Sequence, residues 1–253
     1  MPRPIWTGSL SFGLVNVPVG LYSAAEDKTI HFNQLHSGTA ERVKNKRVSS
    51  STGEEIDYSK IVKGYDLGGG EYVVVTREEI ESIEPSRSKT IEISDFVDLD
   101  RIDPVYYKST YYLAPQGPTA EKPYALLLEA MRESNKIGVA SFVFHSKQHL
   151  VAVRPGDGVL VLETMYYDDE IKDPRQLFGD LLGEEMSFSD REMAAAKLLV
   201  DSMAAEWDPS LYKDNYREKL LELIERKARG ETITLEPVAE EKAPVVDLLA
   251  ALE

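Results

Sequence analysis

The chain has 253 residues, of which 42% are hydrophobic, and its formal net charge is −15. This length is enough for a sizeable core, organised as one domain or as one domain with an appendage. The absence of cysteine excludes disulfide bonds and thiolate zinc sites. The sequence has neither a run of about 18 apolar residues nor the apolar core of a signal peptide. We therefore expect no membrane partner and a cytoplasmic location.

A curved pair of β-strands is the first predicted element, over residues 5–22. Apolar side chains occupy even positions before Gly13 and odd positions after it: Trp6, Leu10, Phe12 and Leu14, then Val15, Val17, Val19 and Leu21. Because a change of parity switches the buried face, we predict a bend or bulge at Gly13. Pro18 has no N–H for a ladder, which predicts a sheet edge, or pairing on one side only, at that point.

A long excursion with turn signals follows, over residues 28–95. Hairpin turns are predicted at residues 51–53 and 67–70, and a short helix is expected to begin near Thr76. The strands expected in this excursion are residues 72–75 and 90–93.

Residues 42–47, within this excursion, hold four cations in six positions. In a strand, Arg42, Lys44 and Lys46 would share one face with a spacing of about 6.5 to 7 Å, which suits a phosphate backbone. A charged strand edge that discourages aggregation explains the same pattern, and short basic runs are weak motifs. Residues 1–63 carry a balance of +2 and the rest of the chain −17, so the acidity lies outside the N-terminal quarter.

The middle of the chain predicts more β-structure with one helix. An aromatic-rich strand is expected at residues 105–114, and an amphipathic helix at 122–134. The expected three-strand meander comprises residues 137–145, 150–154 and 159–167. A mixed, mainly β fold with a β-barrel core or a strongly curved sheet fits these elements best.

From Ser189 the pattern becomes helical. Ser189 and Glu192 form a capping box, and an apolar stripe follows at Met193, Ala196, Val200, Met203 and Trp207. A second helix is predicted to begin with Asp208 as N-cap and to end at residues 227–230. This helical hairpin either packs on its own barrel or serves a subunit interface, in which case Val200, Met203 and Trp207 are its anchors.

Residues 236–243 have the composition of a polar linker. Beyond it we expect a short helix with an apolar face made by Val245, Leu248, Leu249 and Leu252. A short helix of this kind is marginal in isolation. It either docks on its own core or inserts into a groove of a partner.

Enzyme motifs are weak throughout. The pairs His31/His36 and His145/His149 lack the carboxylate and the helical context of a metal site, and residues 68–70 lack the Lys-Ser/Thr of a phosphate loop. The acidic run at residues 168–170 offers magnesium ligands, although such runs are usually solvated. We therefore predict no catalytic residue, no metal and no cofactor. A magnesium-dependent enzyme is the least favoured of the three functional hypotheses considered for this sequence.

Several motifs resemble one known family. The opening W-T-G-S-x-x-F-G-L-V-N-V-P-V, residues 6–19, closely resembles the start of the bacterial Ku proteins. The similarity continues in the same order along nearly the whole chain, through residues 42–48, 86–93, 102–107, 111–115 and 122–127.

The resemblance implies sequence-independent binding of double-stranded DNA ends by a homodimeric ring in non-homologous end joining. It also implies recruitment of a multifunctional ATP-dependent DNA ligase, no catalysis by the protein itself, and a nucleoid-associated location. Residues 1–188 would form the core, with a DNA-encircling bridge at about 28–95. Residues 189–235 would form a helical arm, and residues 236–253 a linker and ligase-recruiting helix.

The expected DNA contacts are cations that meet phosphates without reading bases. They are Arg42, Lys44, Lys46, Arg47, Lys60 and Lys63, followed by Arg87, Lys89 and Arg154. The alternative from a different class is an acidic protein-interaction scaffold in which the basic segment is incidental.

Overall fold

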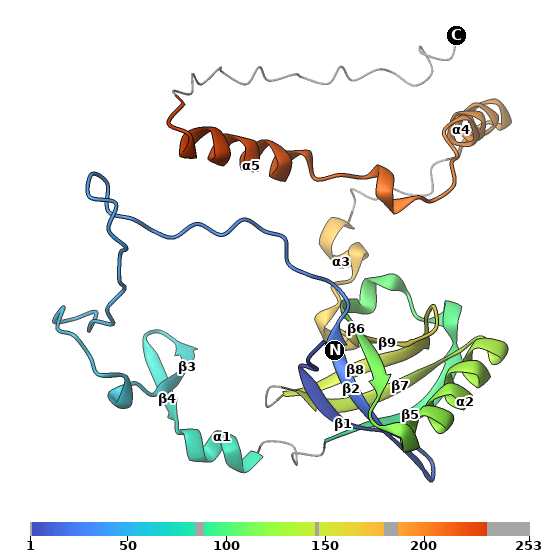
Figure 1. The fold of residues 1–253 in the computed structure, drawn as a ribbon, viewed down its shortest axis with the longest axis horizontal. Helices are drawn as coiled ribbons and strands as arrows, with labels where there is room; N and C mark the ends of the chain where they lie inside the picture. Colours follow the sequence, from blue (N-terminus) through green and yellow to red (C-terminus); the bar gives the residue numbers. More distant parts are fainter. Residues whose placement is uncertain (1, 84–88, 145–146, 180–186, 232–253) are drawn as a thin grey trace. The chain divides into compact units, whose positions relative to one another are not determined.

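A computed structural model describes residues 2–83, 89–144, 147–179 and 187–231. Its central feature is a closed barrel of seven strands in the order β1-β2-β6-β9-β8-β7-β5 (Figure 1). The strands are β1 (Trp6–Phe12), β2 (Val15–Ser23), β5 (Thr90–Asp98), β6 (Tyr107–Pro115), β7 (Lys136–Phe144), β8 (Lys147–Pro155) and β9 (Leu160–Met165). The predicted barrel is therefore confirmed.

β1 and β2 form the predicted strand pair. Phe12 pairs with Val15, so Gly13 and Leu14 make a two-residue turn, and Gly13 has the positive φ of 57° that such a turn needs. The change of parity thus comes from a hairpin turn and not from a bulge within one strand. Pro18 faces Ser9 of β1, whereas the register with β6 begins only at Val19. The Pro18 carbonyl oxygen nevertheless accepts from the Gln116 N–H, one residue past β6, at 2.9 Å, so the predicted pairing on one side only is wrong.

One parallel pairing closes the barrel. Residues Ser9 to Phe12 of β1 run parallel to Thr90 to Ile93 of β5, and the other neighbouring strands of the barrel are antiparallel. The meander β7-β8-β9 is confirmed, with Gly138 of β7 opposite Val153 of β8 and Leu162 of β9 next in line. The predicted turn between β7 and β8 lies partly outside the described residues, at 145–146.

Helix α2 (Pro118–Ser134) packs on the barrel core through Ala120, Tyr124, Leu127, Leu128 and Met131. Its spacing confirms the predicted amphipathic face. The predicted start at residue 122 is wrong by four residues, because Pro118 supplies the fixed φ of a first helical position while Pro123 lies inside the helix. Pro118 therefore marks the first turn of α2, whereas Pro123 lies within the helix.

Tyr124 ties the helix to two strands. Its hydroxyl donates to the Leu113 carbonyl oxygen of β6 at 2.5 Å and accepts from the Leu160 N–H of β9 at 2.7 Å. Burial raises the pKa of Tyr124, so its hydroxyl stays protonated and can donate.

Replacing this hydroxyl should destabilise the barrel. Tyr124→Phe takes a partner from two buried backbone groups, and we expect a loss of about 1 to 3 kcal/mol in the free energy of unfolding. Urea denaturation measures it, with Tyr112→Phe on the exposed side of β6 as the control. An unchanged midpoint for Tyr124→Phe would show that the two bonds contribute nothing.

The excursion between β2 and β5 carries little regular structure. β3 (Lys63–Gly68) pairs with β4 (Glu71–Val75) as a separate two-stranded sheet, and α1 (Arg77–Ile83) follows. The turns and the β4 strand are as predicted, and Thr76 caps α1 by accepting from the Glu79 N–H at 3.1 Å. β3 was not predicted, since its glycines and Asp66 interrupt the apolar pattern.

Residues 174–231 of the chain form a compact unit with residues 28–32, separate from the unit that holds the barrel. The helices of this second unit are α3 (Pro174–Phe178), α4 (Asp190–Ser202) and α5 (Asn215–Ala228). The capping box of Ser189 and Glu192 is confirmed. α4 ends at Ser202, however, so Met203 and Trp207 lie beyond it.

The second helix of this unit starts later than predicted. Asp208 caps only the short 3-10 turn Pro209–Leu211, and α5 begins after Asp214, whose carboxylate accepts from the Arg217 N–H at 2.9 Å. Two competing acidic caps six residues apart make the start ambiguous in sequence. The predicted end at residues 227–230 is confirmed, with Gly230 at a positive φ of 79°.

Candidate nucleic-acid interface

The cations of residues 42–47 lie between two small loops, which we call the basic loops (residues 34–56). The first loop is closed by a hydrogen bond from the Val43 N–H to the Gln34 carbonyl oxygen at 3.0 Å. The second is closed by the Ile56 N–H and the Arg47 carbonyl oxygen at 2.9 Å. Isolated bridges occur here in place of a continuous strand, so the predicted strand with Arg42, Lys44 and Lys46 on one face is wrong.

All four cations of the basic loops are exposed, and three have side-chain contacts. Arg42 donates to Asn33 Oδ1 at 2.8 Å, and Lys46 forms an ion pair of 2.6 Å with Glu55. The Arg47 guanidinium lies 4.9 Å from the centre of the Tyr58 ring. Each contact holds a long side chain near the loop, and an exposed ion pair of this kind costs only about 0 to 1 kcal/mol to break.

Two further predicted cations follow the basic loops directly. Lys60 lies in the 3-10 turn Tyr58–Lys60, and Lys63 begins β3; both are exposed. Asp57 starts this turn by accepting from the Ser59 N–H, and that hydrogen bond lowers the pKa of its carboxyl group. The turn thus adds a fixed negative charge beside the cations.

The remaining predicted contacts fall into different settings. Lys89 is exposed just before β5, and its carbonyl oxygen accepts from the Ser9 N–H at 2.8 Å. Arg87 lies outside the described residues. The structure therefore gathers Arg42, Lys44, Lys46 and Arg47 in one segment and places Lys89 at the barrel.

Arg154 of β8 is engaged by a buried acid. Its Nη2 and Nε lie 2.7 and 3.1 Å from Glu163 Oε1 on β9, while Thr110 of β6 donates to Glu163 Oε2 at 2.6 Å. Glu163 is only 5% exposed. A buried carboxylate left without its cation would be costly, so this pair holds three adjacent strands together and neutralises Arg154. Among the predicted contacts, Arg154 has the weakest claim to a phosphate.

The anchors predicted at the helical arm are strongly exposed. Val200, in the last turn of α4, is 69% exposed, and Met203 and Trp207 are both 77% exposed. The Trp207 ring stacks on Tyr212 with 5.2 Å between the centroids. The ligase-recruiting residues Val245, Leu248, Leu249 and Leu252 lie outside the described residues.

Residues set aside as enzyme candidates have local roles. Asp168 accepts from the Tyr106 hydroxyl at 2.9 Å, and Glu170 accepts from the Tyr167 N–H at 2.8 Å. His36 Nδ1 contacts Thr39 Oγ1 at 3.1 Å, and His145 is outside the described residues. Within the described ranges, no three His, Asp or Glu side chains come together as metal ligands. In the same ranges, no helix has the length and apolar character needed to cross a bilayer.

Tyr58 and Glu55 are the residues that sequence reasoning missed at the basic loops. Both contact a predicted cation, at 11 and 9 positions from Arg47 and Lys46 respectively. The turn signal at residues 51–53 was the available clue, because a hairpin there brings residues 46–48 next to 54–56. An aromatic ring beside an exposed guanidinium also stabilises it through a cation–π contact.

Fold and site together define a β-barrel protein whose excursion between β2 and β5 carries the exposed basic loops. A family model described as the Ku70/Ku80 beta-barrel domain matches residues 11–196. The chain belongs to this Ku family.

Named relatives agree with the family model. The chain is 46% identical, over its whole length, to non-homologous end joining protein Ku 1 of Saccharopolyspora erythraea, of which it covers 77%. It is 43% identical to the Ku of Anaeromyxobacter sp., covering 99% of this chain and 85% of that protein. It is 37% identical to the Ku of Bacillus subtilis, covering 98% and 80%.

Proposed function

We propose that this protein binds the ends of double-stranded DNA, without reading base sequence, in double-strand break repair by non-homologous end joining. The relatives' shared name supports the process. The observation that carries the binding role is the set of four exposed cations in the basic loops of a chain whose net charge is −15. Affinity for a duplex comes largely from neutralising phosphates, so these cations must supply it locally. No catalytic step is part of the proposal.

The proposed contacts are phosphate contacts. Arg42, Lys44, Lys46 and Arg47 come first, then Lys60 and Lys63, with Arg87 and Lys89 in support and Arg154 last. Contacts with phosphates fix orientation but carry no sequence information. Side chains that are exposed and only loosely paired can turn toward a backbone of any sequence at little cost.

A competition between linear and closed circular duplex tests the proposal. We expect linear DNA of the same sequence to bind at least about tenfold more tightly in a mobility-shift assay, because a threaded ring has no lateral entrance. Bulky hairpins on both ends of the linear duplex should remove the difference. Equal affinity for the closed circle would leave only general, charge-driven binding, as in the alternative of an acidic interaction scaffold.

We further propose a homodimeric ring in which residues 28–95 form the bridge and residues 189–235 the arm. The β3-β4 sheet is evidence that the bridge packs against a partner, because a two-stranded sheet alone is only marginally stable in water. Its Tyr65, Tyr72 and Val74 side chains are mostly exposed. Two-fold dimers are the commonest soluble homo-oligomers, so we propose a second copy of the chain as the partner.

Charges at the arm should weaken the dimer. Met203→Glu or Trp207→Glu places a carboxylate on an apolar seam, where an unpaired buried charge is unfavourable, and we expect at least a tenfold rise of the dimer dissociation constant. Sedimentation at micromolar concentration measures it, with Glu206→Gln as the control. Variants that dimerise like the parent would remove these residues from the interface.

We propose that the segment 236–253 recruits the multifunctional ATP-dependent DNA ligase. Its sequence joins a polar linker to four apolar residues at helical spacing, a pattern typical of a helix that inserts into a groove. A nucleoid-associated location in the cytoplasm follows from the proposed DNA binding.

A further inference from the structure

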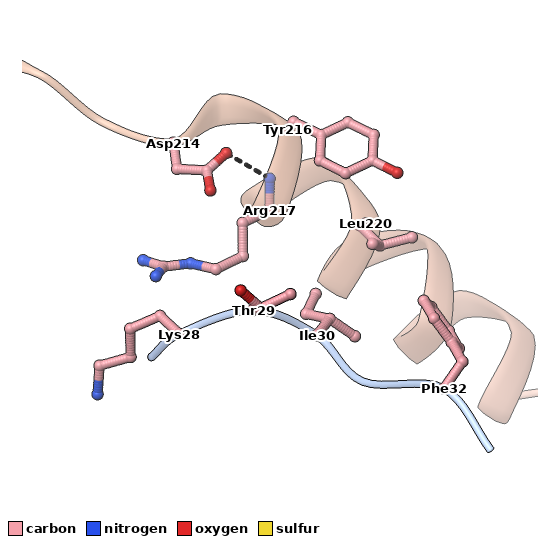
Figure 2. Close-up of a pocket in the computed structure, with 8 residues that line it drawn as sticks. All are labelled: Lys28, Thr29, Ile30, Phe32, Asp214, Tyr216, Arg217 and Leu220. Carbon is pink, nitrogen blue, oxygen red and sulfur yellow. Dashed lines mark hydrogen bonds between the residues drawn. The ribbon is translucent and has the colours of Figure 1, made fainter. Parts of the chain in front are cut away.

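The second unit contains a hollow with two unlike ends. Residues 28–32 run beside the first half of α5, and the space between them is about 500 Å³ (Figure 2). Its lining comes from Lys28, Thr29, Ile30, Phe32, Asp214, Tyr216, Arg217 and Leu220. The volume is within the range of about 300 to 1,000 Å³ that is typical of small-ligand sites.

One end of the hollow is cationic. Figure 2 shows the side chains of Lys28 and Arg217 extending at the same end, from the two opposite walls. Asp214 adds one negative charge there, but its carboxylate is committed to the start of α5 through the Arg217 N–H at 2.9 Å. Among the residues that line this end, two cations therefore accompany one carboxylate, and the planar guanidinium of Arg217 is suited to a phosphate.

The other end is apolar and holds an aromatic ring. Ile30 and Leu220 are half-buried and face one another across the hollow, while Phe32 lies at its far end with 68% of its surface exposed. A flat apolar group placed against Phe32 would cover a ring that is otherwise in water. The lining of the hollow is therefore complementary to a ligand with an anionic group and a flat, apolar body.

We propose that this hollow holds one unpaired nucleotide of a single-stranded overhang at a DNA end, with its phosphate at Lys28 and Arg217 and its base stacked on Phe32. The inference rests on the proposed function and extends it to the single-stranded part of an end. Cationic grooves with aromatic platforms bind single strands without sequence preference, because every base has a π face. A base inside a duplex cannot use such a platform, since both of its faces are already stacked on neighbouring pairs. An acidic, apolar peptide would use the same two ends, but it would gain less from the exposed ring.

Fluorescence anisotropy with three duplexes tests the inference: a blunt one, one with a four-nucleotide overhang, and one whose overhang is abasic. We expect the parent protein to bind the overhang about tenfold more tightly than the blunt end, and the abasic overhang to lose most of that gain. Phe32→Ala should remove the gain for the normal overhang and leave both other affinities unchanged. Arg217→Gln should weaken the normal and the abasic overhang alike.

Matched controls lie outside the hollow. Phe188→Ala removes another exposed ring, and Arg226→Gln removes an α5 cation that pairs with Glu231 at 3.0 Å; both should bind all three duplexes like the parent.

The two proposals fail separately. A parent protein that does not bind blunt duplex contradicts the proposed function, whereas an unchanged overhang gain in Phe32→Ala contradicts the hollow. Loss of ligase stimulation in Phe32→Ala with an unchanged overhang gain would assign the hollow to a peptide and overturn the inference as well.

Discussion

Replacing Arg42, Lys44 and Arg47 together with glutamate should reduce the affinity for linear duplex by at least about 100-fold, or roughly 2.7 kcal/mol. Charge-assisted contacts are lost and repulsion is added, and a dimer carries both changes twice. Lys46 is left in place because its ion pair with Glu55 helps to close the second basic loop. Mobility shift at about 100 mM salt measures the effect, and base sequence should not alter it.

A charge-matched control separates local contact from net charge. Replacing Arg191, Lys197 and Lys227 of the helical unit with glutamate changes the chain's charge equally and should alter the affinity by less than about threefold. The parent should lose affinity steeply between about 50 and 200 mM salt, and the salt slope should fall by about 0.9 for every phosphate contact removed. A basic-loop variant that binds like the parent would show that these cations are only solvated surface.

Deleting residues 238–253 should abolish stimulation of the cognate ligase while binding to DNA ends stays unchanged. The removed segment has apolar residues at helical spacing and only one cation, Lys242. It therefore has an apolar surface for a protein partner but little positive charge for phosphate. Ligation of a linear duplex, with and without the truncated protein, measures the first effect, and mobility shift measures the second.

Point variants make the deletion specific. Leu248→Glu combined with Leu249→Glu should reproduce the loss, because both side chains belong to the proposed apolar face. Glu240→Gln combined with Glu241→Gln in the linker should not. Ligation that is stimulated equally by the truncated and the full chain would assign ligase contact to another part of the protein.

The acidic net charge is compatible with DNA binding because of where the acids lie. The −17 balance belongs to residues 64–253, whereas residues 1–63 have a balance of +2. A charge further away than a Debye length of about 8 to 10 Å is largely screened at physiological salt. Phosphates next to the basic loops therefore respond to the cations near them more than to distant acids.

The sequence by itself determined the elements whose signals are local. The parity change at Gly13, the meander β7-β8-β9, the amphipathic face of α2 and the capping box at Ser189 each depend on residues that are neighbours in sequence. Side-chain periodicity and helix caps involve only a few consecutive residues, so they can be recognised from a single sequence. The run of four cations that supports the proposed DNA contact is of the same kind.

Only the tertiary structure decided the features that depend on residues far apart in sequence. The parallel β1–β5 pairing closes the barrel across about 80 residues, and Glu163 neutralises Arg154 from the neighbouring strand. Lys28 and Arg217 meet at one hollow although 189 positions separate them. The cations at 42–47 lie in irregular loops because closing bonds on either side, and not strand pairing, fix their backbone. Such contacts arise from packing and from strand order, which no short window of sequence contains.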